Sequence, residues 1–220
     1  LSYASRELAN SSYQQVLCSV IQRLRRDHAS SRTPSGIGLT GSSGIVYALA
    51  HIAVAAKQDD ALRLANLIAA TVQVSACETR LDIMDGCAGL IKGLSALYSI
   101  VNADSVLKSI VAAANVLVRE SSDLAGKVNR NTILTGYAHG AAGMADALGT
   151  AARLTGVDLY LAAAERFVDY ERHLFSAANQ SWPDLRPGAG EGAFACGWCH
   201  GAPGIGLSRI SLSGILQDAE

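Results

Sequence analysis

The residues of this chain that are best suited to chemistry are an aspartate, two histidines and two cysteines. They are Asp82, His139, Cys196, Cys199 and His200. The last three belong to residues 196–206, which read Cys-Gly-Trp-Cys-His-Gly-Ala-Pro-Gly-Ile-Gly. Thiols, imidazoles and carboxylates act as nucleophiles, acid–base groups and metal ligands, so these segments can support enzyme chemistry.

Three kinds of chemistry fit the Cys-x-x-Cys-His spacing: attachment of a c-type haem, thiol–disulfide exchange and metal binding. Haem attachment needs an oxidising compartment and a second axial ligand. The only methionines that could supply this ligand are Met84 and Met144. A thiol-redox motif usually lies in a βαβ setting, which the sequence does not suggest. Taken alone, the segment also fits two half-buried cysteines in a glycine-rich loop.

Four copies of a Gly-x-x-Gly pattern organise the chain around these residues. They occupy 41–44, 86–89, 140–143 and 201–204, and their second glycines are separated by 45, 54 and 61 residues. Recurrence at such spacing indicates a stacked repeat with one supersecondary unit per copy. Because the residues around each copy differ, a regular scaffold carries chemically unequal loops on one rim.

Two kinds of helical pattern alternate between these copies. Stretches rich in small and apolar residues, typical of buried helices, follow the glycine pairs at 45–56, 90–100, 144–154 and 205–216. Amphipathic helices are predicted at 64–72, 106–117, 160–174 and, near the N-terminus, at about 7–26. The sequence therefore predicts an all-α fold, a ring or arc of helical hairpins with the buried helices inside.

Composition narrows the class of protein. The 220 residues are 50% hydrophobic and 17% charged with a net charge of −1, so no electrostatic argument points to nucleic acid. The longest apolar stretches fall short of the ~20 residues that a membrane span needs. The N-terminus shows no signal peptide, and five irregularly spaced cysteines make a poor disulfide framework. We therefore expect a cytoplasmic protein.

Three segments together resemble a known family. Residues 198–205 resemble the first zinc-cysteine motif of the lanthionine synthetase C-like family, and are closest to the cyclase domain of class II lanthipeptide synthetases. Residues 136–143 resemble the catalytic-histidine motif of that family. Residues 82–89 resemble its aspartate motif, in which the functional carboxylate stands four residues before the first glycine, here Asp82 rather than Asp85.

The resemblance implies an α/α toroid of about seven helical hairpins and a zinc-dependent lanthionine synthetase. Such a cyclase adds a cysteine thiolate of a precursor peptide to dehydrated Ser or Thr, that is, to dehydroalanine or dehydrobutyrine. By this resemblance Cys199 is a zinc ligand, with His200 and Cys196 as less favoured candidates. His139 serves as the acid–base residue and Asp82 orients it or stabilises its charged form.

The chain departs from the family pattern at its C-terminal end. It stops at Glu220, before the second zinc motif, Cys-His-Gly, can occur, and it holds about four of the roughly seven hairpins of a closed ring. We therefore expect residues 1–220 to be a partial cyclase domain of a longer enzyme, with an incomplete zinc site. The open apolar edge of such an arc favours self-association.

Two other functions remain open at this stage. The chain can be a catalytically inactive toroid fragment that binds a peptide or a partner. It can also be another α/α toroid enzyme, acting on sugars or prenyl groups, for which Asp82 and Asp85 are the only carboxylates that the notable motifs offer. Arg209, where the other copies carry leucine, can either face the ring centre and contact the substrate or form an ion pair between helices.

Overall fold

The computed structural model describes residues 11–32, 36–75, 80–122, 124 and 133–216. The helices are α2 (Ser11–Ala29), α3 (Ser42–Ala55), α4 (Asp59–Ala69), α5 (Cys87–Val101), α6 (Asp104–Ser121), α8 (Ala141–Thr155), α9 (Asp158–Leu174) and α10 (Ala202–Leu212). Within these ranges there is no β-strand, only isolated β-bridges. The prediction of an all-α fold is confirmed. None of the described helices is both long and apolar enough to span a bilayer.

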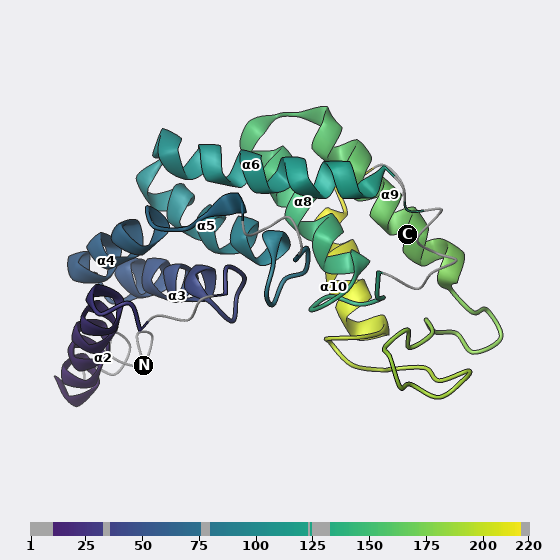
Figure 1. The fold of residues 1–220 in the computed structure, drawn as a ribbon, viewed down its shortest axis with the longest axis horizontal. Coiled ribbons are helices and arrows are strands. Elements are labelled where there is room, and N and C mark those ends of the chain that lie inside the picture. Colours follow the sequence, from purple (N-terminus) through teal and green to yellow (C-terminus); the bar gives the residue numbers. More distant parts are fainter. Residues whose placement is uncertain (1–10, 33–35, 76–79, 123, 125–132, 217–220) are drawn as a thin grey trace.

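Three helical hairpins, α3–α4, α5–α6 and α8–α9, follow one another along an arc, and α10 continues it (Figure 1). On the inner side, α3 packs against α5, α5 against α8 and α8 against α10. On the outer side, α6 packs against α9. The predicted alternation of inner and outer helices is therefore correct, while closure of the arc into a ring stays a prediction.

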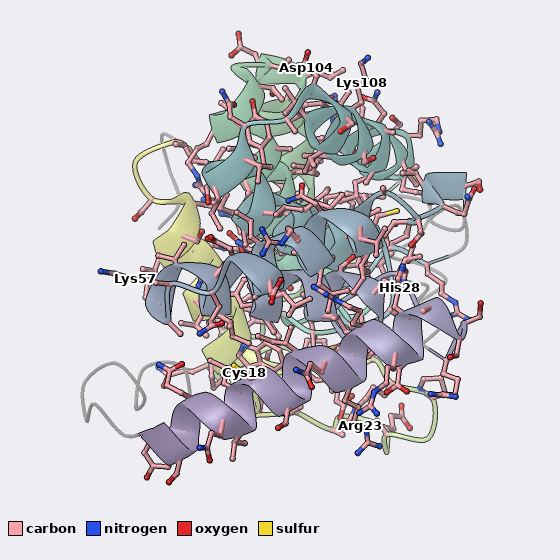
Figure 2. All side chains as sticks on the ribbon, turned by 90° about the vertical axis from the view of Figure 1, so that its left-hand side faces the viewer. Cys18, Arg23, His28, Lys57, Asp104 and Lys108 are labelled. Atoms are coloured by element: carbon pink, nitrogen blue, oxygen red, sulfur yellow. The ribbon has the colours of Figure 1, made fainter. Side chains whose placement is uncertain are left out.

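Helix α2 lies across one end of the arc and packs against α4. Cys18, Arg23 and His28 are spread along it, on the side of the molecule away from α10 (Figures 1 and 2). The predicted helix at 7–26 ends three residues too early, and residues 7–10 lie outside the described part of the chain.

Each inner helix begins between the two glycines of its Gly-x-x-Gly pair. The residues that precede the first turns are Gly41, Gly86, Gly140 and Gly201. The helices therefore start about three residues earlier than predicted, because the second glycine lies inside the first turn rather than before it. Helix α10 ends at Leu212 instead of 216, since the chain is extended at Ser213 and turns at Gly214 with φ of +91°.

The loops before the inner helices are hydrogen-bonded to one another in series. The Leu39 N–H donates to the Ile83 carbonyl at 3.0 Å, and the Ile83 N–H donates to the Ala138 carbonyl at 3.1 Å. The Tyr137 N–H in turn donates to the Trp198 carbonyl at 3.4 Å. Backbone contacts of this kind fix the four glycine loops along one rim of the arc.

The second glycine of each pair makes room for this series. A Cβ atom on Gly89 would lie 1.9 Å from the Ile83 carbonyl oxygen, and one on Gly204 would lie 2.0 Å from the Trp198 carbonyl oxygen. These are the carbonyls that accept the hydrogen bonds from the preceding loops. The glycines are therefore required by close packing of backbone against backbone.

Burial of the inner helices depends on their neighbours. Helix α8 packs between α5 and α10 and buries nearly all of its residues. Among the described helices, α10 packs chiefly against α8, and Ile210 is 72% exposed. The prediction of a fully buried helix is therefore wrong for α10, because no further described element covers its outer face.

We predict opposite effects for alanine at two helical glycines. Gly89→Ala should lower the free energy of unfolding by about 3 kcal/mol, because the new methyl group overlaps backbone that cannot move aside. Gly206→Ala should raise it by about 0.5–1 kcal/mol, because nothing lies within 4 Å of its Cβ position and alanine favours the helix. Urea unfolding measures both, and equal effects would contradict the packing role of Gly89.

Candidate functional site

His139 and Asp82 meet although 57 residues separate them. The Nδ1 atom of His139 lies 2.8 Å from Oδ2 of Asp82, and the histidine side chain remains 35% exposed. The other carboxylate oxygen of Asp82 accepts the Asp85 N–H at 2.7 Å, which fixes the orientation of the carboxylate. With the proton on Nδ1 donated to Asp82, the Nε2 atom of His139 is left for acid–base work.

Asp82 and Asp85 have different hydrogen-bond partners. Asp85 accepts a hydrogen bond from the Thr40 hydroxyl, which belongs to the preceding glycine loop. Asp82 therefore faces the histidine, whereas Asp85 links two loops of the scaffold.

The loop that carries Cys199 and His200 packs directly on the loop that carries His139. The imidazole rings of His139 and His200 are stacked, with their centroids 5.3 Å apart and their planes 14° from parallel. Gly136 allows this approach, since a Cβ there would lie 2.6 Å from the Cys199 carbonyl oxygen and its φ is +101°. The structure thus brings Asp82, His139 and His200 into one site, next to Cys199.

The described structure does not gather the predicted zinc ligands into a metal site. Cys196 and Cys199 are both exposed free thiols, and the Nδ1 atom of His200 is buried without a hydrogen-bond partner in the described structure. Over the described residues, no three His, Cys, Asp or Glu side chains are grouped so that they could hold a metal ion. A thiolate suits zinc, so Cys199 fits as one ligand, and its role stays a prediction.

A tight ion pair supports the loop beside these residues. The guanidinium of Arg186 binds both carboxylate oxygens of Asp184, whose side chain is only 7% exposed. This hydrogen bonding lowers the pKa of Asp184 to about 2. Burial, together with the positive charges of Arg186 and His139, lowers the pKa of His200. The Asp184–Arg186 pair therefore belongs to the electrostatic surroundings of the site.

An open cavity of about 580 Å³ lies beside Asp82 and His139. It is lined by Arg80, Leu81, Asp82, Asp85, Ile133, Leu134, His139 and Met144. Its size suits one or two side chains of a peptide, with an apolar wall, a cation at Arg80 and His139 in reach.

Two buried charged clusters lie near the site, and only the ion pair of Arg209 was anticipated from the sequence. In the first, Asp146 of α8 binds Lys92 of α5 at 2.9 Å and accepts hydrogen bonds from Tyr137 and Ser211. Burial opposes ionisation of Asp146, but Lys92 and these two hydroxyls outweigh it and lower its pKa. A signal was present: Lys92 and Asp146 stand at the same repeat position, three residues after the second glycine, within apolar helices.

The second cluster decides the role of Arg209. Its Nη2 atom lies 2.9 Å from Oε2 of Glu171, which is fully buried on α9. Of the two alternatives for Arg209, the ion pair between helices is the one observed. A signal was present: Glu171 stands four residues after Phe167 and three before Leu174, on the apolar stripe of this amphipathic helix.

Comparison with known proteins extends the resemblance noted in the sequence. The family model described as lanthionine synthetase C-like protein matches residues 1–220. No curated protein matches the chain.

The Asp184–Arg186 pair predicts a pH dependence. Because the folded pKa of Asp184 is depressed from 3.8 to about 2, its contribution to stability is present above pH 3.8 and is lost as the pH falls toward 2. Arg186→Met should raise the pKa of Asp184 to 3.8 or above, measured by carboxyl NMR titration. Arg172→Met, which removes an exposed arginine paired with Asp169, should leave it unchanged. An unaltered Asp184 titration in Arg186→Met would contradict the assignment.

Proposed function

Because the chain belongs to the lanthionine synthetase C-like family, we propose that it closes thioether rings in a precursor peptide. A cysteine thiol of the peptide adds to dehydroalanine or dehydrobutyrine and gives lanthionine or methyllanthionine. The observation that carries the proposal is the 2.8 Å contact between His139 and Asp82 beside the Cys199–His200 loop. We further propose that the cyclase is of the class II type. Because the reaction uses a free thiol, the proposal places it in a reducing compartment such as the cytoplasm.

In the proposed reaction His139 handles the proton. The thiol gives up its proton to solvent, the sulfur bonds to the β-carbon, and the π electrons of the dehydro residue move toward its carbonyl as an enolate. The α-carbon of the enolate then takes up a proton, which His139 supplies from Nε2. Asp82 holds the ring through Nδ1 and stabilises the charged imidazole that donates this proton.

Zinc is the proposed cofactor, with Cys199 as one ligand and His200 and Cys196 as further candidates. When bound, zinc supplies the positive charge that keeps a thiol, with an ordinary pKa of ~8.5, in its thiolate form near neutral pH. The cation nearest in its electrostatics to Cys199 is Arg186, whose own pKa is raised mainly by its hydrogen bond to Asp184.

The cavity beside His139 is the proposed place for the peptide around the reacting residue. Ile133, Leu134 and Met144 offer apolar contacts, and Arg80 is exposed at the same cavity. Since His139 lines this cavity, a dehydro residue held there has its α-carbon near the acid–base group.

Substitution of His139 tests the reaction. His139→Ala should slow ring formation about 10²–10⁴-fold, because the enolate loses its proton donor. Mass spectrometry after alkylation of unreacted thiols in a dehydrated peptide measures the rings. The control is His51→Ala, which removes an exposed histidine of α3 whose ring packs against the ring of Tyr47. A wild-type protein that binds the peptide and forms no rings would instead identify an inactive binding scaffold.

Zinc affinity tests the cofactor separately. Cys199→Ala should weaken zinc binding at least about tenfold, because a thiolate ligand is lost. Competition with a chromophoric chelator measures the affinity without a need for activity. Cys18→Ala is the matched control, since Cys18 is an exposed thiol on α2 at the far end of the arc (Figure 2). Equal affinities in the two variants would remove Cys199 from the zinc site.

A further inference from the structure

We propose that Glu171 is a positioning residue for His139: its buried carboxylate closes the loop that carries the histidine and joins it to α10, the helix that follows the Cys199–His200 loop. This inference rests on the proposed function for its catalytic consequence, whereas the positioning itself can be measured without catalysis.

One oxygen of Glu171 holds both ends of the His139 loop. Its Oε1 atom accepts the Gly136 N–H at 3.0 Å and the Ala142 N–H at 3.2 Å. Gly136 precedes His139 by three residues and Ala142 follows it by three. The acid–base residue therefore stands at the middle of a segment whose two ends are bonded to a single atom.

These two N–H groups require an acceptor from outside their own segment. Ala142 lies in the first turn of α8, where backbone N–H groups have no partner within the helix. Gly136 has φ of +101° and lies against the Cys199 backbone. A carboxylate at this helix N-terminus satisfies both donors, and its negative charge interacts favourably with the helix dipole.

The other oxygen of Glu171 reaches the neighbouring repeat. Oε2 accepts a hydrogen bond from Nη2 of Arg209, on the helix that follows the Cys199–His200 loop. The backbone carbonyl of Glu171 also accepts the indole N–H of Trp182 at 2.8 Å. The last turn of α9 therefore ties the His139 loop to α10 and to the long loop that leads into it.

A purely stabilising role would not need this chemistry. Glu171 is fully buried, and taking an ion pair out of water costs several kcal/mol that a well-packed apolar pair avoids. An apolar pair could fill the same space between α9 and α10. It could not accept the two N–H groups that flank His139, and this difference separates positioning from packing.

Two double variants isolate that difference. Glu171→Gln with Arg209→Met removes both charges and keeps a carbonyl oxygen for the Gly136 and Ala142 N–H groups. Glu171→Met with Arg209→Met removes the same charges and also the acceptor. Glu165→Gln, an exposed carboxylate on the same helix, is the control for a change of charge on α9.

We expect the two double variants to have equal thermal stability but to differ in amide exchange and in kcat. Amide hydrogen exchange at Gly136 and Ala142, followed by NMR, should be about tenfold faster or more in the Met–Met variant than in the Gln–Met variant. The kcat for ring formation should fall about tenfold or more in the Met–Met variant, with KM changed little, because misplacement of His139 affects the chemical step. The Gln–Met variant and Glu165→Gln should stay near the wild type in both.

Equal exchange rates and equal kcat in the two double variants would overturn the inference. If neither variant folds, Glu171→Asp decides: it keeps the charge but withdraws the oxygens by one methylene, so faster exchange and lower kcat support positioning, and wild-type values overturn it. A wild-type protein that forms no rings while the exchange rates differ as expected would overturn the proposed function and leave the clamp on the His139 loop supported.

Discussion

Direct contact between the backbones of successive glycine loops is the constraint on which the rest of the structure depends. The carbonyls of Ile83 and Trp198 accept hydrogen bonds from the loops before them, and they do so inside space that a side chain on Gly89 or Gly204 would fill. Close contact leaves little freedom in the relative position of the loops. Side chains that stand at equivalent points of different repeats are thereby brought within reach of one another.

The site is assembled from side chains that lie at these contacts. Asp82, His139 and His200 come from three successive loops, and each pair of neighbouring loops contributes one contact between them. His139 stays partly exposed because its loop lies at the rim, beside an open cavity. A reactive imidazole needs this combination: a fixed partner on one nitrogen and access for substrate at the other.

Buried charges lie beneath the site, where the scaffold is otherwise apolar. The ion pair of Glu171 with Arg209 joins α9 to α10, and that of Asp146 with Lys92 joins α8 to α5. Glu171 and Asp146 also accept hydrogen bonds from the His139 loop. Burial raises the pKa of Glu171 to about 7, and Arg209 and the two backbone N–H groups oppose that rise. Such pairs contribute little net stability, but they specify one geometry, because a displaced partner leaves an uncompensated charge.

The sequence by itself determined the all-α fold, the alternation of inner and outer helices and the importance of the glycine pairs. These follow from periodicity and from short motifs, which depend on residues near one another in the chain. The tertiary structure alone decided that His200 stacks on His139, that Glu171 holds Gly136 and Ala142, and that α10 leaves Ile210 exposed. These features depend on how segments far apart in the sequence pack together, and that packing is set by the whole core rather than by any one segment.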